Sequence, residues 1–258
     1  LPDLTSAQIL ETTRIHSVSG PLEGAGLVAR PPFRDPHHSA SLAALVGGGS
    51  RARPGEVSLA HNGVLFLDEL PEFSRQCIES LRQPVETESI TIARAARHVT
   101  YPARFQLIAA MNPCRCGYLG DAERSCRKAP RCGEDYTGKI SGPMLDRIDL
   151  RLDVQPVSPI DISRAPPGED SAAIRARVMV ARDRQIARQG IPNAQADPSG
   201  FDISEAAREL AEQASERLRL SARGLTRLLR VAMTIADLAG EDQIGRPHVA
   251  EALGFRQR

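Results

Sequence analysis

The chain has no tryptophan and few aromatic residues of any kind. Six Phe and three Tyr occur in 258 residues, so the core has to be built mainly from aliphatic side chains. No apolar segment approaches the roughly 20 residues that a transmembrane helix needs, and the N-terminus lacks the pattern of a signal peptide. We therefore expect a soluble, cytoplasmic protein with no membrane partner.

A strong excess of charge of either sign is also absent. The formal net charge is +1, which excludes a global attraction to polyanions, so any nucleic-acid contact has to come from a local patch. Nearly all basic residues are Arg, the exceptions being Lys128 and Lys139. The length allows one large domain or two of moderate size.

The most informative segment is an apolar run that ends in two adjacent carboxylates. Residues 64–67 read Val-Leu-Phe-Leu and lead directly into Asp68 and Glu69. Such a run is typical of a strand buried on both faces, as in a parallel sheet covered by helices. Asp68 then lies at the carboxyl edge of the sheet, where α/β folds bind ligands such as a Mg²⁺-bound nucleotide. Glu69 is suited to polarise an attacking water. The alternative is a buried strand that ends in two solvated acids.

Local signals predict the remaining elements of the first part of the chain. Thr5 and Gln8 match a capping box for a short helix that ends near Thr13. Ser39 is expected to cap a helix over 40–46, and Ser74 to start a helix that Pro84 stops. We further predict an edge strand over 27–30, a hairpin with strands 90–92 and 98–101, and buried strands over 104–111 and 150–154.

The composition changes near residue 156, where a proline-rich stretch begins. Four prolines and a glycine lie between residues 155 and 170, and four segments with helical apolar spacing follow at 171–189, 203–218, 221–239 and 246–253. We predict an α/β core over 1–155, a linker over 156–170 and a small all-α lid domain over 171–258. The start at Leu1 is typical of the middle of a domain, so we expect a fragment of a longer protein.

Several motifs in order carry a resemblance to a known family. They are Arg30–His38, Leu45–Gly49, Arg53–Glu56, Leu59–Gly63, Leu67–Phe73, Ala110–Pro113, Ser141–Leu150 and Leu220–Gly224. Together they resemble the AAA+ ATPase region of the magnesium-chelatase-like family, in particular its ComM-type branch, over nearly the whole chain. The resemblance implies an AAA+ P-loop NTPase-type parallel sheet flanked by helices, incomplete at its N-terminal side.

The resemblance also implies roles for individual residues in binding and hydrolysing Mg-ATP. Asp68, in the Walker B position, holds Mg²⁺ through its water shell. Glu69 positions the attacking water and Asn112 matches sensor 1. Arg147 matches an arginine finger that acts on a neighbouring subunit, which implies a homo-oligomer, expected to be a hexamer. Arg223 matches sensor 2. The alternatives are a turn-forming Asn112 before a proline, and surface or salt-bridge roles for Arg223 and for the weaker candidate Arg227.

The sequence departs from the family pattern in one respect, because no Walker A loop precedes the acidic pair. That loop supplies the backbone N–H groups and the Lys that bind the β- and γ-phosphates. We therefore expect the chain by itself to be inactive as an ATP hydrolase, and the intact protein to have an upstream P-loop. The missing strand is expected to leave a gap between the strands ending at Val154 and Met111.

Four of the five cysteines lie close together in a polar segment. Cys114, Cys116, Cys126 and Cys132 have the spacing Cys-x-Cys-x₉-Cys-x₅-Cys, which suits a tetrahedral zinc site in an insert over 114–132. The alternative is a set of metal-free loop thiols, since disulfides are rare in the cytosol. Cys77 is expected to be an ordinary buried residue. We expect His37, His38 and His61 to pack or cap rather than to act chemically.

Two pairs of Arg residues are candidates for contact with DNA: Arg51 and Arg53 in the glycine-rich loop, and Arg94 and Arg97 near the hairpin tip. Their alternative is solvated Arg on flexible loops. The resemblance implies an ATP-driven hexameric DNA motor, a branch-migration helicase of natural transformation. The competing functions are the ATPase subunit of a magnesium chelatase and a catalytically inert, zinc-stabilised assembly module.

Overall fold

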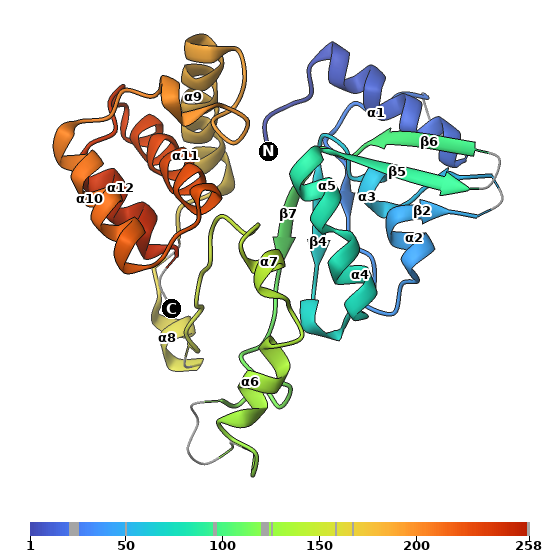
Figure 1. The fold of residues 1–258 in the computed structure, drawn as a ribbon, viewed down its shortest axis with the longest axis horizontal. Coiled ribbons are helices and arrows are strands. Elements are labelled where there is room, and N and C mark those ends of the chain that lie inside the picture. Colours follow the sequence, from blue (N-terminus) through green and yellow to red (C-terminus); the bar gives the residue numbers. More distant parts are fainter. Residues whose placement is uncertain are drawn as a thin grey trace. The chain divides into compact units, whose positions relative to one another are not determined.

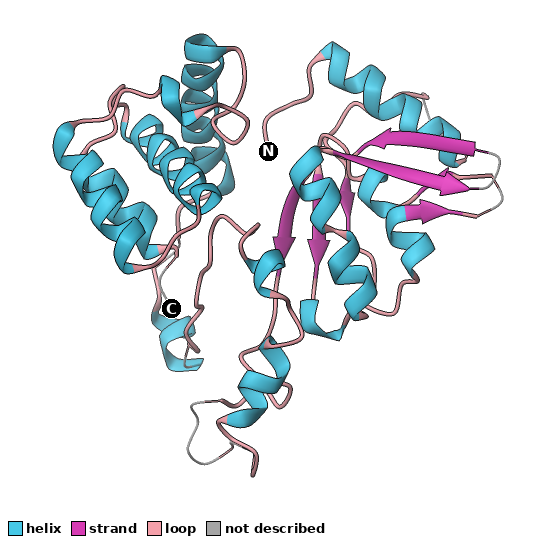
Figure 2. Cartoon of the chain, in the orientation of Figure 1, coloured by secondary structure: helices cyan, strands magenta, loops and turns pink. Residues whose placement is uncertain are grey.

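The computed structural model describes residues 1–20, 26–49, 51–94, 97–119, 124, 126–157, 159–166 and 168–256. The chain forms two compact units, of which one extends from Asp3 to Arg147 and the other from Ile148 to Arg258. The first unit contains all the named strands and the second is helical (Figures 1 and 2).

A parallel three-stranded sheet forms the centre of the first unit. Its strands β1 (Phe33–Arg34), β4 (Val64–Leu67) and β7 (Gln106–Ala109) have the order β1-β4-β7. The side chains of Leu65 and Leu67 are fully buried, which confirms the prediction of a buried strand before the acidic pair. Leu67 pairs with Ala109, so β4 and β7 end at the same edge of the sheet.

Two antiparallel hairpins accompany the sheet. One pairs β2 (Gly47–Gly48) with β3 (Arg53–Pro54), and the other pairs β5 (Ser89–Arg94) with β6 (Arg97–Pro102). The second confirms the predicted hairpin, although its turn lies outside the described residues. Gly47 has a φ of +98°, and a Cβ atom there would lie 2.6 Å from the Arg53 carbonyl oxygen, so this close approach requires glycine.

Helix α1 (Ser6–Ser19) begins at the predicted capping box but is longer than predicted. The Thr5 N–H donates to Gln8 Oε1 (2.9 Å) and the Gln8 N–H donates to Thr5 Oγ1 (3.3 Å). The prediction that it ends near Thr13 was wrong because the next residue that breaks a helix is Gly20.

The short helices of the first unit correct two further predictions. They are α2 (Leu42–Val46), α3 (Glu56–Leu59), the 3₁₀ helix η1 (Leu70–Glu72), α4 (Arg75–Ser80), α5 (Arg82–Thr87), α6 (Arg131–Thr137) and α7 (Gly142–Leu145). Ser41, not Ser39, caps α2 by accepting the Ala44 N–H at 3.2 Å. Ser74 caps α4 as expected, but Pro84 does not stop a helix. It lies in the first turn of α5, where no intrahelical N–H donor is needed.

Two predicted strands are absent from the described structure. The backbone N–H of Val28 donates to the Thr13 side chain at 3.0 Å rather than to a neighbouring strand. The segment 150–154 belongs to no helix and no sheet, with Leu152 70% and Val154 91% exposed. A strand needs a partner for its backbone groups, whereas Arg151 N–H donates to Phe255 O at 2.9 Å. Among the described residues, β7 pairs with β4 alone.

The second unit is a bundle of α9 (Ser171–Gln189), α10 (Glu205–Arg217), α11 (Ala222–Ala239) and α12 (Arg246–Gly254). Their bounds lie within two residues of the predicted segments. Its core combines small Ala side chains with the fully buried Leu228, Met233, Ile244 and Val249. Two shorter helices, α8 (Pro159–Arg164) and the 3₁₀ helix η2 (Pro198–Gly200), complete the unit. Among the described residues, no helix is both long and apolar enough to cross a membrane.

Candidate nucleotide-binding edge and cysteine cluster

The acidic pair lies directly after β4, at the carboxyl edge of the parallel sheet. Asp68 is exposed, and its Oδ1 accepts the Glu69 N–H at 2.9 Å. Glu69 has a left-handed backbone conformation, with φ of 51°, which non-glycine residues adopt at an energetic cost and often at functional sites. This turn directs the chain from β4 into η1 and leaves both carboxylates accessible.

Asn112 reaches the same edge from the next strand. The Leu70 N–H donates to the Ala110 carbonyl oxygen at 3.0 Å, so the chains that leave β4 and β7 remain paired beyond the strands. Asn112 follows two residues later and is exposed. The parallel register therefore brings the chain positions of Asp68, Glu69 and Asn112 to one edge of the sheet, although Asn112 lies more than 40 residues after the acidic pair.

His38 is a member of this edge that the sequence did not indicate. Its Nδ1 lies 3.1 Å from Glu69 Oε2. Its ring lies against His37, at 4.1 Å between centroids, and has an edge contact with Phe73 at 6.4 Å. His38 follows β1, which borders β4 on the side opposite β7. In the sequence, His38 ends the Arg30–His38 motif, which does not identify Glu69 as a partner because that contact requires the sheet order.

Arg147 follows α7, and its side chain is engaged within its own unit. The guanidinium pairs with Glu86 of α5 and donates from Nη1 to the Pro143 carbonyl oxygen at 2.6 Å. Only 12% of the side chain is exposed. The sequence motif gave no sign of Glu86 as a partner, because the two residues are 61 positions apart.

The two arginines of the predicted lid differ in their surroundings. Arg223 is exposed in the first turn of α11. Arg227, one turn later, donates from Nη1 to Asp149 Oδ1 at 2.7 Å, and its side chain is 16% exposed. Arg227 therefore has the salt-bridge geometry that we considered as the alternative to a role in nucleotide binding.

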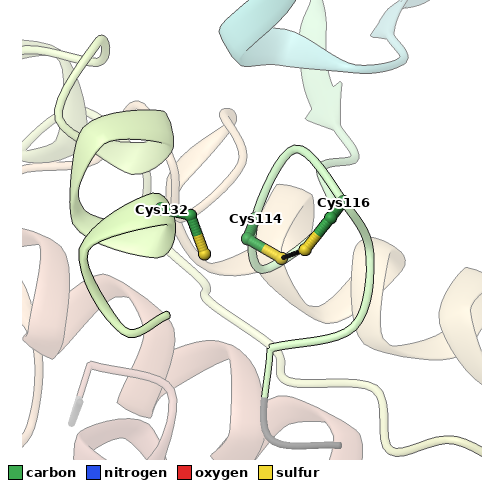
Figure 3. A group of neighbouring side chains, drawn as sticks. All are labelled: Cys114, Cys116 and Cys132. Carbon is green, nitrogen blue, oxygen red and sulfur yellow. Dashed lines mark hydrogen bonds between the residues drawn. The ribbon is translucent and has the colours of Figure 1, made fainter. Parts of the chain in front are cut away.

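Three cysteines come together, with Cys114 and Cys116 in the segment that follows β7 and Cys132 in the first turn of α6 (Figure 3). The Sγ atoms of Cys114, Cys116 and Cys132 all lie within 4.8 Å of one another, and those of Cys114 and Cys116 are 3.1 Å apart. All five cysteines of the chain are free thiols. Sulfur atoms around a tetrahedral zinc ion are about 3.8 Å apart, given a Zn–S bond of about 2.3 Å, so small side-chain movements would fit these three to one ion.

The fourth predicted ligand, Cys126, is half-buried beside this group and interacts with two of its members. A backbone hydrogen bond at Tyr118, then hydrogen bonds with Cys114 and Cys126, lower the pKa of Cys116 to about 6. Desolvation, followed by the interaction with Cys126, raises the pKa of Cys132 to about 12. Opposite shifts are expected where crowded thiols share one negative charge.

The candidate DNA-contacting arginines lie on the two hairpins. Arg51 and Arg53 are exposed at the β2–β3 hairpin. Arg94 and Arg97 pair with each other at the end of the β5–β6 hairpin, but their side chains lie outside the described part of the chain. The Tyr101 hydroxyl donates to the Ala52 carbonyl oxygen at 2.9 Å and connects the hairpins. The two hairpins are thus in contact at the end of β6 opposite to Arg94 and Arg97.

A parallel α/β unit with an acidic pair at its carboxyl edge, joined to a helical unit, has the architecture of the AAA+ ATPases. Residues 1–162 match the family described as magnesium chelatase, subunit ChlI, and residues 168–256 match its C-terminal family. The chain belongs to this magnesium-chelatase family.

Three curated relatives have closely similar levels of identity. The Escherichia coli protein YifB is 44% identical over 267 residues, covering 99% of this chain and 51% of YifB. Competence protein ComM of Haemophilus influenzae is 45% identical over 264 residues, covering 99% of this chain and 51% of ComM. The Mycobacterium bovis protein Mb2921c is 46% identical over 268 residues, covering 100% of this chain and 52% of Mb2921c. The chain thus spans about half the length of these relatives.

Proposed function

We propose that this chain is the Walker B, sensor and lid part of an ATP-driven DNA motor of the ComM type. The observation that carries the proposal is the convergence of the Asp68–Glu69 pair and Asn112 at one edge of a parallel sheet. Similarity to competence protein ComM over 99% of the chain supports the choice of motor. In the proposal, a part of the intact protein outside this chain supplies the P-loop, and its strand pairs with β7.

Each residue at the edge then has a defined task. Asp68 holds Mg²⁺ through water, and the bound ion neutralises charge on the phosphates. Glu69 orients or deprotonates the attacking water, and the Asn112 amide holds that water against the γ-phosphate. Arg147 of a neighbouring subunit stabilises the charge that spreads over the transferred phosphoryl group. Arg223 couples the position of the lid to the state of the nucleotide.

Hydrolysis of Mg-ATP by the full-length protein tests this proposal. Glu69→Gln keeps the shape of the side chain and removes the base, and we expect it to lower kcat by at least about 100-fold. Glu212→Gln, an exposed position on α10, is the matched control and should leave kcat unchanged. If Glu69→Gln retains the wild-type rate, the proposed site is wrong.

The ATPase subunit of a magnesium chelatase is the second candidate, and the description of the matched family favours it. Stimulation of ATP hydrolysis distinguishes the two. Branched DNA should increase the rate of a DNA motor, whereas chelatase partner subunits should increase the rate of a chelatase subunit. If the full-length protein hydrolyses no ATP under either condition, the third candidate, a zinc-stabilised assembly module, is the one supported.

We propose that Cys114, Cys116, Cys126 and Cys132 bind one zinc ion. The clustering of three Sγ atoms within 4.8 Å, with Cys126 beside them, supports this. A metal would order a segment that has few apolar residues. Metal analysis of protein purified without chelator should find about one zinc per chain, and Cys132→Ser should remove it. Cys77→Ser changes a thiol of α4 and should leave the zinc content unchanged, while less than half an equivalent in the wild type contradicts the site.

The DNA-contacting surface is proposed to include both hairpins. A hexameric ring that repeats Arg51, Arg53, Arg94 and Arg97 would collect enough positive charge to bind DNA without sequence preference. Combined Arg94→Ala and Arg97→Ala substitution should lower the affinity for DNA and make that affinity less dependent on salt concentration. Assembly of the ring should be unchanged. Unchanged DNA binding by normal rings would exclude the β5–β6 hairpin.

A further inference from the structure

The turn between the last two cysteines is unusually basic. The five residues between Cys126 and Cys132 are Arg127, Lys128, Ala129, Pro130 and Arg131, and all five are exposed. Three of them are cationic and none is acidic, in a protein whose formal net charge is only +1. This is the kind of local patch that a nearly neutral chain needs in order to attract a polyanion.

Backbone hydrogen bonds fix the shape of this turn. The N–H of Ala129 donates to the Cys126 carbonyl oxygen at 3.0 Å, and that of Cys132 donates to the Lys128 carbonyl oxygen at 3.1 Å. The Gly133 N–H, in the first turn of α6, donates to the Pro130 carbonyl oxygen at 3.0 Å. Both ends of the turn are therefore held next to the candidate zinc ligands Cys126 and Cys132.

The three cations surround a single shallow hollow. Arg127, Lys128 and Arg131 line it together with Ala129 and Pro130, and among the described residues Asp135 of α6 is the one acidic residue in the lining. Within this described lining, three cations against one carboxylate leave an excess of positive charge around a concave surface. That arrangement suits a phosphate group, which accepts hydrogen bonds from several Arg and Lys side chains at once.

The competing explanation is that these cations balance the charge of the metal site. A zinc ion with four thiolates has a net charge of −2. Nearby Arg and Lys residues lower the electrostatic free energy of that negative charge. Exposed cations that line an outward-facing hollow are also available to an external anion, so the two explanations predict different effects of neutralising them. If the cations only balance the metal site, neutralising them should release zinc. If they bind an external anion, neutralising them should abolish that binding while zinc remains.

We infer that the zinc-bound turn 126–132 is a phosphate-binding surface that contacts the backbone of DNA. This inference rests on the proposed function, because that function supplies DNA as the partner. The turn adds a contact that is separate in sequence from the two hairpins. Since the contact is to phosphate, it should be indifferent to base sequence and weaken steeply with salt.

The test measures binding of the full-length protein to a fluorescently labelled DNA duplex across a series of salt concentrations. Combined Arg127→Gln, Lys128→Gln and Arg131→Gln substitution should raise Kd roughly 10- to 100-fold at low salt. It should also reduce the slope of log Kd against log salt by about 2 to 3, because up to three phosphate contacts are lost. The matched control removes three exposed arginines of the second unit, Arg208, Arg217 and Arg219, and should leave both quantities unchanged.

Zinc content and chelation separate the possible outcomes. The triple variant should retain the zinc of the wild type, and chelation should reduce wild-type DNA binding to the level of the triple variant. Unchanged Kd and salt slope in the zinc-bound triple variant would overturn the inference, as would loss of zinc as its only defect. If the wild type itself binds no DNA, it is the DNA part of the proposed function that fails.

Discussion

At the residue scale, the contact between His38 and Glu69 has a consequence for the proposed chemistry. His38 lies on the β1 side of β4, whereas Asn112 follows β7 on the other side. The contact with His38 therefore places the Glu69 carboxylate on the side away from the residue with which it would share a water. In the proposed mechanism, Glu69 would break this contact in order to act with Asn112.

His38→Phe tests this consequence in the full-length protein. The substitution keeps a ring against Phe73 but removes the contact of Nδ1 with the Glu69 carboxylate, which is worth up to about 1 kcal/mol between partly exposed partners. We expect the rate of ATP hydrolysis without DNA to rise by up to about fivefold, with an unchanged KM for ATP. His37→Phe is the control, because His37 contacts Ser39 instead. A lower rate in His38→Phe would show that the contact assists catalysis.

Acid should destabilise the first unit through His61. This side chain is buried, accepts the Arg104 N–H at Nδ1 (3.1 Å) and lies 3.3 Å from Glu11 through Nε2. Burial lowers the pKa of His61, so the unfolded chain takes up the proton first as the pH falls. The stabilisation is complete above about pH 6.5 and is lost as the pH falls toward the folded-state pKa.

Thermal unfolding between pH 7.5 and 5.5 measures this effect. The melting temperature should fall with acidification, and His61→Gln should make it less dependent on pH. His98→Gln changes an exposed histidine of β6 and should keep the wild-type dependence. An identical slope in His61→Gln and the wild type would exclude His61 as the source.

At the element scale, a buried ion pair joins α9 to α11. Asp237 is 2% exposed and accepts hydrogen bonds from Arg188 at 2.8 and 2.9 Å and from Asn193 at 2.7 Å. The ion pair raises the pKa of Arg188. Removing one member of such a network leaves the others buried without compensation, which commonly costs about 3 to 5 kcal/mol.

Asp237→Ala should therefore lower the free energy of unfolding of the helical unit by several kcal/mol, measured by denaturant titration. Asp242→Ala is the matched control. Asp242 also binds an arginine, Arg184 at 2.7 Å, but its own side chain is 91% exposed, so we expect a loss below about 1 kcal/mol. Equal losses in the two variants would mean that burial does not determine the strength of these pairs.

Elements with local signals were predictable from the sequence, whereas elements that depend on a distant partner were not. Asp170, Ser204 and Ser221 cap α9, α10 and α11, so these helices begin next to residues that the sequence identifies. The segment 150–154 has the apolar pattern of a strand, but its backbone finds Phe255 rather than a sheet. Pattern alone does not reveal whether a partner strand is present.

At the scale of the whole molecule, the proposed arginine finger requires a second subunit. Within its own unit Arg147 is bound to Glu86, so assembly has to exchange that contact for the neighbouring site. Arg147→Ala in the full-length protein should lower kcat roughly 10³-fold or more while ATP binding is retained. A side chain with a purely structural role would instead lower thermal stability and ATP binding together.

Mixing experiments show whether Arg147 acts on the neighbouring subunit. Rings assembled from Glu69→Gln and Arg147→Ala subunits contain some interfaces with both residues intact, so they should recover part of the activity. In rings mixed from Glu69→Gln and Asp68→Ala subunits, every site lacks one of its two acidic residues, so these rings should stay inactive. No recovery in the first mixture, with normal assembly, would contradict action in trans.

The sequence by itself determined the features that local chemistry controls. An apolar run predicted β4 and the place of Asp68 and Glu69, a capping box predicted the start of α1, apolar spacing predicted the lid helices, and cysteine spacing predicted a thiol cluster. Only the tertiary structure decided which side chains meet across the sheet and between helices. His38 reaches Glu69, and Arg147 reaches Glu86, because parallel strand order and packing bring distant segments together, and no local pattern encodes those distances.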